Sequence, residues 1–298
     1  MEKHDAAFLK KMAAKLEKNP PLHDNKVLDI PEGQWNEPLV DMDRVKIFRG
    51  AAKNWDCHKK WTFDYFTQRY GNMEIEFYGS PGLNEKDAAQ TGTSTFAQYI
   101  EELRKGTKLY LKFSPIIHAD STLRDDFNTE WLEKFHPPGS FGKKFFLFMG
   151  AKKTVTPIHC AMGHTVFVQI RGSKKWYFWE PSDRLFLGAR SEGRAYFYSH
   201  AHPTFENKEQ FPLLKHAKRY EFELHEGDIL WFPRFFWHHV ENLTDSIGVA
   251  YKFAHIPSAA KNSFLLTMLS VLATKLFLLS SMYKARGNNF KFSMNNLK

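Results

Sequence analysis

The chain has 298 residues, of which 43% are hydrophobic and 16% aromatic, and this composition excludes a disordered protein because it supplies enough apolar surface for a large core. The net charge of +9 indicates a basic, well-solvated surface or an acidic partner, but no motif typical of RNA or DNA binding accompanies it, so no nucleic acid is expected. The two cysteines, Cys57 and Cys160, exclude a disulfide framework and predict a reducing, cytoplasmic compartment.

The first part of the chain mixes helix and strand signals. Residues 1–23 alternate charged side chains with Ala and Leu and contain no apolar run typical of a signal peptide, so a helical extension is expected there. Residues 44–55 predict a buried strand that ends at a Gly turn, and residues 61–71 predict a short helix. A strand and turn over 73–82 precede a second helix over 93–106, which a Ser or Thr can cap.

The second half of the chain has the pattern of a β domain. Short runs of β-branched and aromatic residues follow one another, separated by Gly, Pro and Asp turns. These runs are residues 144–150, 164–172, 174–181, 219–233 and 246–253. Antiparallel strands at this spacing indicate a sandwich or a small barrel. The sequence therefore predicts a mainly β fold with flanking helices.

Two histidines in these runs have the pattern of an incomplete iron site. In a strand, residues two apart point to the same face, so His159 and Ala161 would project into a barrel while Cys160 points away. A His, an acid two residues later and a distant His form the facial triad that holds non-haem Fe(II). His238 is the candidate for the distant His, but Ala161 stands where the acid is expected. By spacing alone, both histidines could instead be hydrogen-bonded core residues.

The text around these residues resembles the JmjC-type cupin family of Fe(II)- and 2-oxoglutarate-dependent oxygenases, including the asparaginyl hydroxylase type that modifies hypoxia-inducible factor and bacterial cupin-like relatives. The resemblance extends over residues 24–258, and its most specific parts are 155–176 and 227–243. It implies a double-stranded β-helix, a jelly-roll core of two facing antiparallel sheets. It also implies a catalytic domain over 24–258, preceded by the extension 1–23 and followed by a C-terminal helical region over 259–298.

The resemblance implies roles for individual residues. His159 and His238 match the two histidine ligands of iron. Lys174 matches the lysine that pairs with the distal carboxylate of 2-oxoglutarate, and an ammonium suits that role because a buried carboxylate needs a charge-assisted partner. Thr156 matches a hydroxyl that helps to hold the same carboxylate, and Thr165 lies where relatives often have Asn near the cosubstrate. Alternatively, Lys174 is a solvated charge in a turn and Thr156 satisfies a backbone group.

Ala161 leaves several interpretations of the chemistry. A halide could take the open coordination position, as in iron halogenases of a related barrel fold, and the site would then use Fe(II), 2-oxoglutarate, O2 and chloride. Water or a nearby carboxylate could instead complete the site of a hydroxylase. Glu241 and Asp228 are the nearby carboxylates, but neither has the spacing expected of a metal ligand. The site could also be disabled, naturally or by an engineered Asp-to-Ala change, which would leave a binding protein. The expected substrate is a peptide or protein side chain, or a small molecule.

Residues 263–283 are almost long enough to span a bilayer. Leu265, Leu269 and Leu272 begin a series of leucines at helical spacing, which predicts a helix packed against the domain or a second subunit. Lys275 lies within the segment, and a central Lys is costly in lipid. Because relatives in the family often pair through C-terminal helices, we expect a homodimer, with membrane contact through 263–283 as the less favoured alternative.

Overall fold

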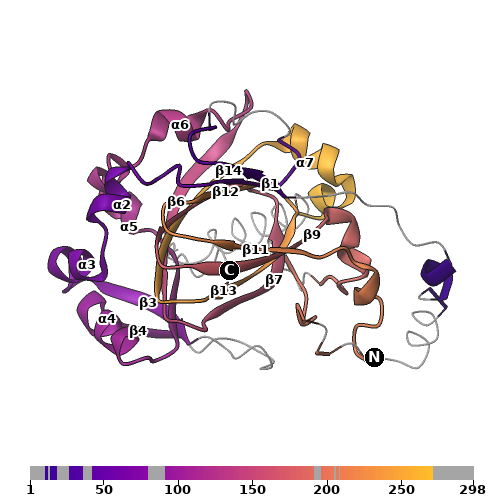
Figure 1. Ribbon diagram of the computed structural model, residues 1–298, viewed down its shortest axis with the longest axis horizontal. Helices are drawn as coiled ribbons and strands as arrows, with labels where there is room; N and C mark the ends of the chain where they lie inside the picture. Colours follow the sequence, from indigo (N-terminus) through magenta and orange to yellow (C-terminus); the bar gives the residue numbers. More distant parts are fainter. Residues whose placement is uncertain are drawn as a thin grey trace, which may run out of the picture.

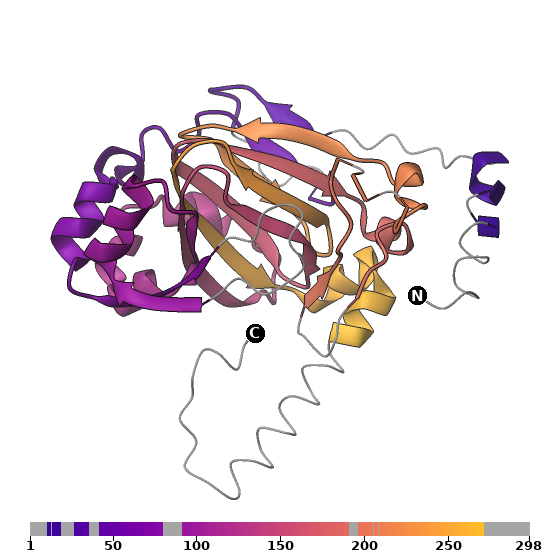
Figure 2. The ribbon, with the colours of Figure 1, turned by 90° about the horizontal axis from the view of Figure 1, so that it is seen from below.

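The computed structural model describes residues 11–12, 14–18, 27–35, 42–79, 91–190, 196–204, 206–207 and 209–270. Two facing β-sheets enclose a barrel, and the helices between β2 and β6 gather on one side of it (Figures 1 and 2). Most of the predicted extension 1–23 and residues 271–298 of the predicted C-terminal region lie outside the described residues. None of the helices within the described ranges has the length and apolar character needed to cross a membrane.

The larger sheet has nine strands in the order β1-β2-β12-β8-β14-β6-β5-β3-β4. In chain order they are β1 (Leu28–Ile30), β2 (Lys46–Phe48), β3 (Glu74–Gly79), β4 (Thr91–Thr95), β5 (Leu109–Ser114), β6 (Phe141–Gly150), β8 (His164–Arg171), β12 (Ile229–Phe232) and β14 (Ser246–Ala254). β1 and β2 are parallel, and the other neighbouring pairs are antiparallel. The strand predicted within 44–55 is short because Gly50, at φ +66°, turns the chain.

The smaller sheet has five strands in the order β10-β7-β13-β9-β11. They are β7 (Val155–Ala161), β9 (Lys174–Trp179), β10 (Tyr196–Tyr198), β11 (Tyr220–Leu224) and β13 (Trp237–Asn242). Along the chain, strands from β6 to β9 and from β12 to β14 alternate between the two sheets and therefore wind around a common interior. This arrangement confirms the predicted mainly β fold with a double-stranded β-helix core.

Short helices connect and flank the strands. They are α2 (Asp56–Lys60), α3 (Phe63–Tyr70), α4 (Phe96–Arg104), α5 (Ile116–Ala119), α6 (Thr129–Glu133) and α7 (Ile256–Asn262), with 3-10 helices η1 (Ser121–Arg124), η2 (Pro181–Leu185) and η3 (Leu214–His216). Both predicted helices are present. The Thr62 hydroxyl caps α3, and Thr95 forms a capping box with Gln98 at the start of α4.

Apolar side chains are buried on both faces of each sheet, which explains why the strands are so rich in aromatic residues. One cluster, which includes Trp61 and Val249, lies between the larger sheet and the helices. A second cluster, which includes Phe167 and Trp176, fills the barrel interior. A third covers the outer face of the smaller sheet and contains Cys160, which points away from the barrel as predicted. Polar groups that project into the interior are therefore surrounded by apolar walls.

Candidate active site

Two histidines lie side by side inside the barrel. His159 on β7 and His238 on β13 are partners in the antiparallel register of the smaller sheet, and their ring centroids are 4.1 Å apart. The His238 ring also packs against Phe232 and Phe178 of the interior cluster, at 4.7 and 5.6 Å. His238 is buried, whereas His159 is partly exposed. The pair therefore lies at the edge of the apolar interior, with His159 nearer to solvent.

Each histidine ring is oriented for metal binding by a hydrogen bond to the backbone carbonyl two residues earlier. The Nδ1 atom of His159 lies 2.9 Å from the Pro157 carbonyl oxygen, and that of His238 lies 3.0 Å from the Phe236 carbonyl oxygen. A carbonyl can only accept, so each Nδ1 donates and each Nε2 keeps a lone pair for a metal. Burial lowers the pKa of His159 to about 4 and holds the pKa of His238 well below its usual value. Both rings are therefore neutral at pH 7.

A β-bulge places Thr156 on the same face as His159. The register pairs His238 with His159 but Val240 with Thr156, so β7 contains one residue more than β13 over this stretch. Simple alternation would direct Thr156 and His159, which are three apart, to opposite faces. The extra residue falls next to Pro157, which cannot donate a ladder hydrogen bond. The bulge thus brings both side chains to the interior.

Among the described residues, no carboxylate completes a metal site with the histidine pair. In the parts of the chain that the structure describes, no group of three or more His, Cys, Asp or Glu side chains could hold a metal ion. Asp228 accepts hydrogen bonds from the Arg49 guanidinium at 2.7 Å and from the Gly50 backbone at 2.9 Å, so its role is structural. Glu241 is three positions after His238 on β13, and strand alternation directs it to the opposite face.

Lys174 is a buried ammonium at the inner end of the barrel. Its side chain is 0% exposed, so it is not the solvated charge that its position in a turn allows. The Nζ atom donates to the Asn242 side chain, to Ser246 Oγ at 3.0 Å and to Tyr110 Oη at 3.4 Å. None of the described carboxylates forms an ion pair with it. Burial, with a smaller effect of the Lys112 charge, lowers the pKa of Lys174 to about 7.

The groups around Lys174 include residues that the sequence did not identify. The Thr156 side chain hydrogen-bonds Tyr110, so the predicted threonine and the unpredicted tyrosine face the ammonium together. Asn242 lies four positions after His238 on the same strand, and alternation places it on the same face. Tyr110 comes from β5, which no motif connects to the barrel. Thr165 is 3% exposed on β8, and it faces the interior because Phe167, two residues later, belongs to the interior cluster.

Two more lysines project towards the histidines. Lys252 on β14 follows Ala250 of the interior cluster by two residues and is the register partner of Thr165. Lys112 on β5 donates to the Val155 carbonyl at 3.2 Å. Burial lowers the pKa of each lysine to about 8, and both positive charges contribute to the low pKa of His159. Neither lysine was among the sequence-predicted site residues.

The remaining histidines near the motifs lie on outer faces. His239 follows His238 directly, so it points away from the barrel, and its ring lies 5.6 Å from that of Tyr177. His164 on β8 stacks against Trp231 at 4.9 Å, on the face of the larger sheet that the helices cover. Both rings therefore lie away from the pair of His159 and His238.

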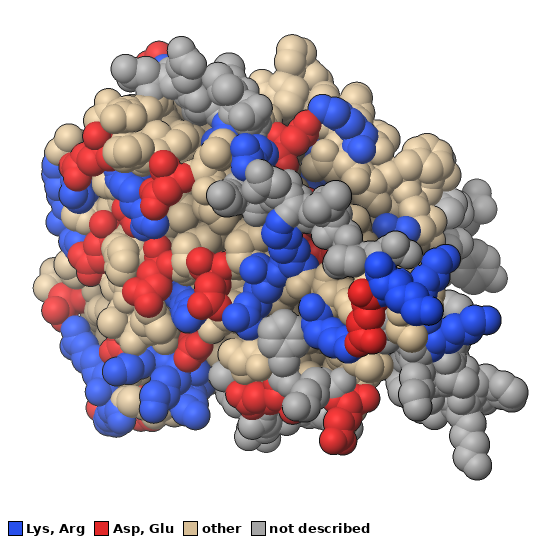
Figure 3. All heavy atoms as spheres, turned by 45° about the vertical axis from the view of Figure 1, so that its right-hand side comes forward, with Lys and Arg blue, Asp and Glu red and all other residues tan. Residues whose placement is uncertain are grey.

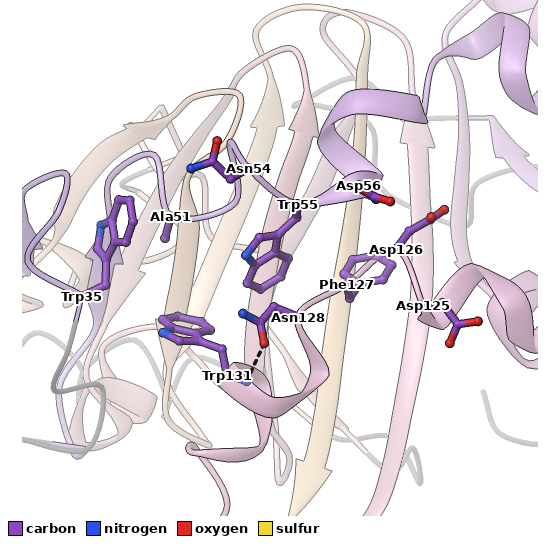
Figure 4. Close-up of a pocket in the computed structure, with 10 residues that line it drawn as sticks. All are labelled: Trp35, Ala51, Asn54, Trp55, Asp56, Asp125, Asp126, Phe127, Asn128 and Trp131. Carbon is purple, nitrogen blue, oxygen red and sulfur yellow. Dashed lines mark hydrogen bonds between the residues drawn. The ribbon is translucent and has the colours of Figure 1, made fainter.

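A cavity of about 400 Å³ lies away from the histidine pair, against the outer cluster near α2 and α6 (Figure 4). It is lined by Trp55, Trp131, Asp126 and neighbouring residues. Its rings pack against one another, with Trp55 and Trp131 centroids 5.8 Å apart, and Asp126 accepts from Lys60 and from the Trp61 indole. Because these groups already satisfy each other, we place the candidate site in the barrel.

Comparisons with known proteins identify the family of the chain. A family model described as a cupin-like domain matches residues 41–259. HSPB1-associated protein 1 from Homo sapiens is 28% identical over 70% of this chain and 47% of its own length. The 2-oxoglutarate and iron-dependent oxygenase JMJD4 from Gallus gallus is 24% identical over 74% of this chain and 55% of its length. The lysine-specific demethylase JMJ30 from Arabidopsis thaliana is 25% identical over 69% and 48%, respectively.

The chain thus spans about half the length of these three relatives. The matched region contains every strand of the barrel from β6 to β14, together with both histidines and Lys174. This match confirms the resemblance that the motifs around His159 and His238 indicated. The chain belongs to the family of cupin-like domain proteins, and the relatives it matches include JmjC-type oxygenases.

Proposed function

We propose that this protein is an Fe(II)- and 2-oxoglutarate-dependent enzyme that oxidises a C–H bond. The proposal rests mainly on the buried ammonium of Lys174, which has no ion-pair partner among the described carboxylates. This ammonium lies in the same barrel interior as the two neutral histidines. Burying an unpaired charge costs several kcal/mol. A chain that had lost this function would gain stability by replacing Lys174 with an apolar residue, so the retained lysine supports a retained anionic ligand.

The residues present fit both groups that the family implies. His159 and His238 would hold Fe(II) through Nε2, since each Nδ1 donates to its own backbone. Lys174 and the Tyr110 hydroxyl would hold the distal carboxylate of 2-oxoglutarate, with Thr156 beside them. When bound, Fe(II) and 2-oxoglutarate together supply the activation of O2 that C–H oxidation requires. The aromatic side chains around His238 would limit the access of water on that side of the metal.

Ala161 makes a halide a second candidate ligand. Two protein ligands leave one more coordination position open than a facial triad does. Ala161 presents only a methyl group, and its carbonyl is held by the Phe235 backbone N–H at 2.9 Å. The positive charges of Lys112 and Lys252 favour an anion near the histidines. Halogenation is therefore the finer alternative to hydroxylation, and chloride dependence distinguishes the two.

The role of the histidine pair can be tested by substitution. His159→Ala and His238→Ala should each reduce Fe(II)-dependent succinate release from 2-oxoglutarate by about 1,000-fold or more, because one protein ligand alone cannot position the metal. His239→Ala is the matched control, since it removes the adjacent ring on the opposite face of β13 and should keep most of the activity. Equal losses in all three variants, with unchanged melting temperatures, would contradict the assignment.

We further propose that the protein is a homodimer that pairs through its C-terminal helical region. Within residues 264–270, Leu266 is 2% exposed and packs on the domain, whereas Phe264, Leu265, Met268 and Leu269 are 42–69% exposed. A row of large apolar side chains on one helix face favours a protein partner. The predicted contact through the rest of 263–283 falls on residues that are not described.

Leu265→Asp combined with Leu269→Asp should convert the dimer into a monomer, because two carboxylates would be buried in an apolar interface. Sedimentation or light scattering gives the mass directly. Asn262→Asp, which adds a negative charge before the exposed row, is the control and should leave the dimer intact. A double variant that remains a dimer, or a wild-type protein that is monomeric, would disprove this interface.

A further inference from the structure

The barrel interior carries positive charges that 2-oxoglutarate does not account for. Lys174, Lys112 and Lys252 all face the interior or its edge, and no carboxylate in the described ranges forms an ion pair with any of them. The two carboxylates of the cosubstrate are accounted for by Lys174 and by the metal that the histidines would hold. Lys112 and Lys252 then remain without an anion, although their charges act directly on His159.

Both lysines belong to the larger sheet, Lys252 on β14 and Lys112 on β5. Lys252 belongs to the inner face of the larger sheet, in one row with Thr165 and Phe232, and this face lies opposite the smaller sheet that carries both histidines. Lys112 comes from β5 and reaches across the gap between the sheets to the Val155 carbonyl at the start of β7. Both side chains are partly exposed, so they are accessible from outside as well as from the interior.

An aromatic residue in an unusual conformation lies beside this lysine pair. Phe113 has φ +55°, which non-glycine residues rarely adopt, and it occupies an irregularity in the register between β5 and β6. This backbone places the Phe113 ring 5.0 Å from Phe148 and 4.9 Å from the Lys252 ammonium, with 40% of the residue exposed. The edge of the site thus presents an apolar platform next to the Lys252 ammonium, while the Lys112 ammonium lies 4.7 Å from the centroid of the Tyr110 ring.

We propose that Lys112 and Lys252 bind a carboxylate of the substrate, so that the enzyme acts on an acidic peptide side chain or a free organic acid whose apolar part packs on Phe113. The inference rests on the proposed function of the histidine pair. It does not follow from the overall charge of +9, because the face shown in Figure 3 carries basic and acidic side chains interspersed. What distinguishes the site is that its lysines lack the acidic neighbours of surface lysines such as Lys53 and Lys105.

The test measures binding rather than turnover. The full-length protein is loaded with Mn(II) and saturating 2-oxoglutarate without oxygen, in chloride-free buffer, and titrated with a fluorescein-labelled peptide containing one Glu or with the same peptide containing Gln. Glutarate is titrated separately by calorimetry. The Glu peptide or glutarate should bind, and Lys112→Met and Lys252→Met should each weaken that binding by about tenfold or more, the loss expected for one charge-assisted hydrogen bond.

Lys143→Gln is the matched control, because Lys143 is exposed and pairs with Glu133 outside the barrel. Binding of the Glu peptide supports a peptide substrate, and binding of glutarate alone supports a small organic acid. The inference is overturned if both peptides bind with equal affinity, if Lys143→Gln and Lys252→Met lose binding equally, or if neither the Glu peptide nor glutarate binds. Binding of 2-oxoglutarate itself, followed in the same samples, shows separately whether the proposed function holds.

Discussion

Replacing Lys174 by Met is expected to weaken 2-oxoglutarate binding by about 100-fold or more, because a buried charge-assisted contact is lost. The same replacement is expected to stabilise the ligand-free protein. The ammonium is fully buried and has no described carboxylate partner, so folding without the cosubstrate requires desolvation of an unpaired charge. Met retains the length and apolar stem of Lys174 without the charge. The melting temperature should therefore rise by several degrees, while affinity for 2-oxoglutarate is lost.

The pH dependence of stability provides a second measure of the same charge. Burial lowers the pKa of Lys174 to about 7 from an ordinary value of 10.5, so between these pH values the unfolded chain binds more protons than the folded protein. The free energy of unfolding of the ligand-free protein should therefore increase as the pH is raised from about 7 towards 10. Lys174→Met should show a smaller increase. Lys112 and Lys252 contribute in the same direction above about pH 8.

Lys175→Met is the control for both measurements. Lys175 is the next residue on β9, but it points outward and pairs with Glu221 at 3.3 Å. Its replacement should leave 2-oxoglutarate affinity unchanged and should not raise the melting temperature. If Lys174→Met lowered the melting temperature and left 2-oxoglutarate binding intact, Lys174 would be a structural residue and the assignment of the cosubstrate site would be wrong.

Ala161→Asp should increase metal affinity by roughly 10–100-fold or more. A group that only hydrogen-bonds a metal ligand already contributes roughly that much, and the introduced carboxylate would bind the metal itself. The strand places position 161 two residues after His159, so an Asp side chain there faces the interior and adds an anionic donor to two neutral ones. Titration of Mn(II), followed by its electron paramagnetic resonance signal, measures the change without turnover. The added carboxylate should also abolish any chloride dependence of activity, because it would occupy the position open to a halide.

Ala161→Asn separates charge from size in this experiment. It has the shape of Asp but a neutral, weaker donor, so it should raise metal affinity much less. If Asp and Asn had the same small effect, position 161 would not face the metal, and the parallel with a facial triad would fail. If Ala161→Asp restored strong hydroxylation to an otherwise inactive chain, the wild-type site would be a disabled one.

Much of the fold and part of the site could be predicted from the sequence. The segments 155–176 and 227–243 carry enough specific residues to indicate the barrel. Strand alternation predicted that the His159 ring lies inside it, whereas His238 was predicted from the pattern of the facial triad and from the resemblance. Lys174 was predicted through the resemblance alone, since its place in a turn is equally compatible with a surface charge. The structure brings Lys174 into the interior because β9 begins at that residue.

The rest of the site depends on long-range pairing and on local irregularities that no sequence pattern records. Tyr110 and Lys112 reach the barrel only because β5 adds to the edge of the larger sheet beside β6. Thr156 faces the interior only because of the bulge next to Pro157, which alternation does not predict. Lys252 is one of many lysines in the sequence, and its position inside the barrel follows from the register of β14 with β8.

Succinate release from 2-oxoglutarate by the purified protein, with Fe(II) and oxygen and with or without chloride, decides whether the histidine pair supports iron-dependent oxidation. We expect release that requires Fe(II) and is lost in His238→Ala. Release that also requires chloride would identify a halogenase, and chloride-independent release would identify an oxygenase that works with two histidine ligands. No Fe(II)-dependent release in either buffer, from protein that is folded and loaded with both groups, would contradict the account and leave a cupin-like barrel that only binds anions.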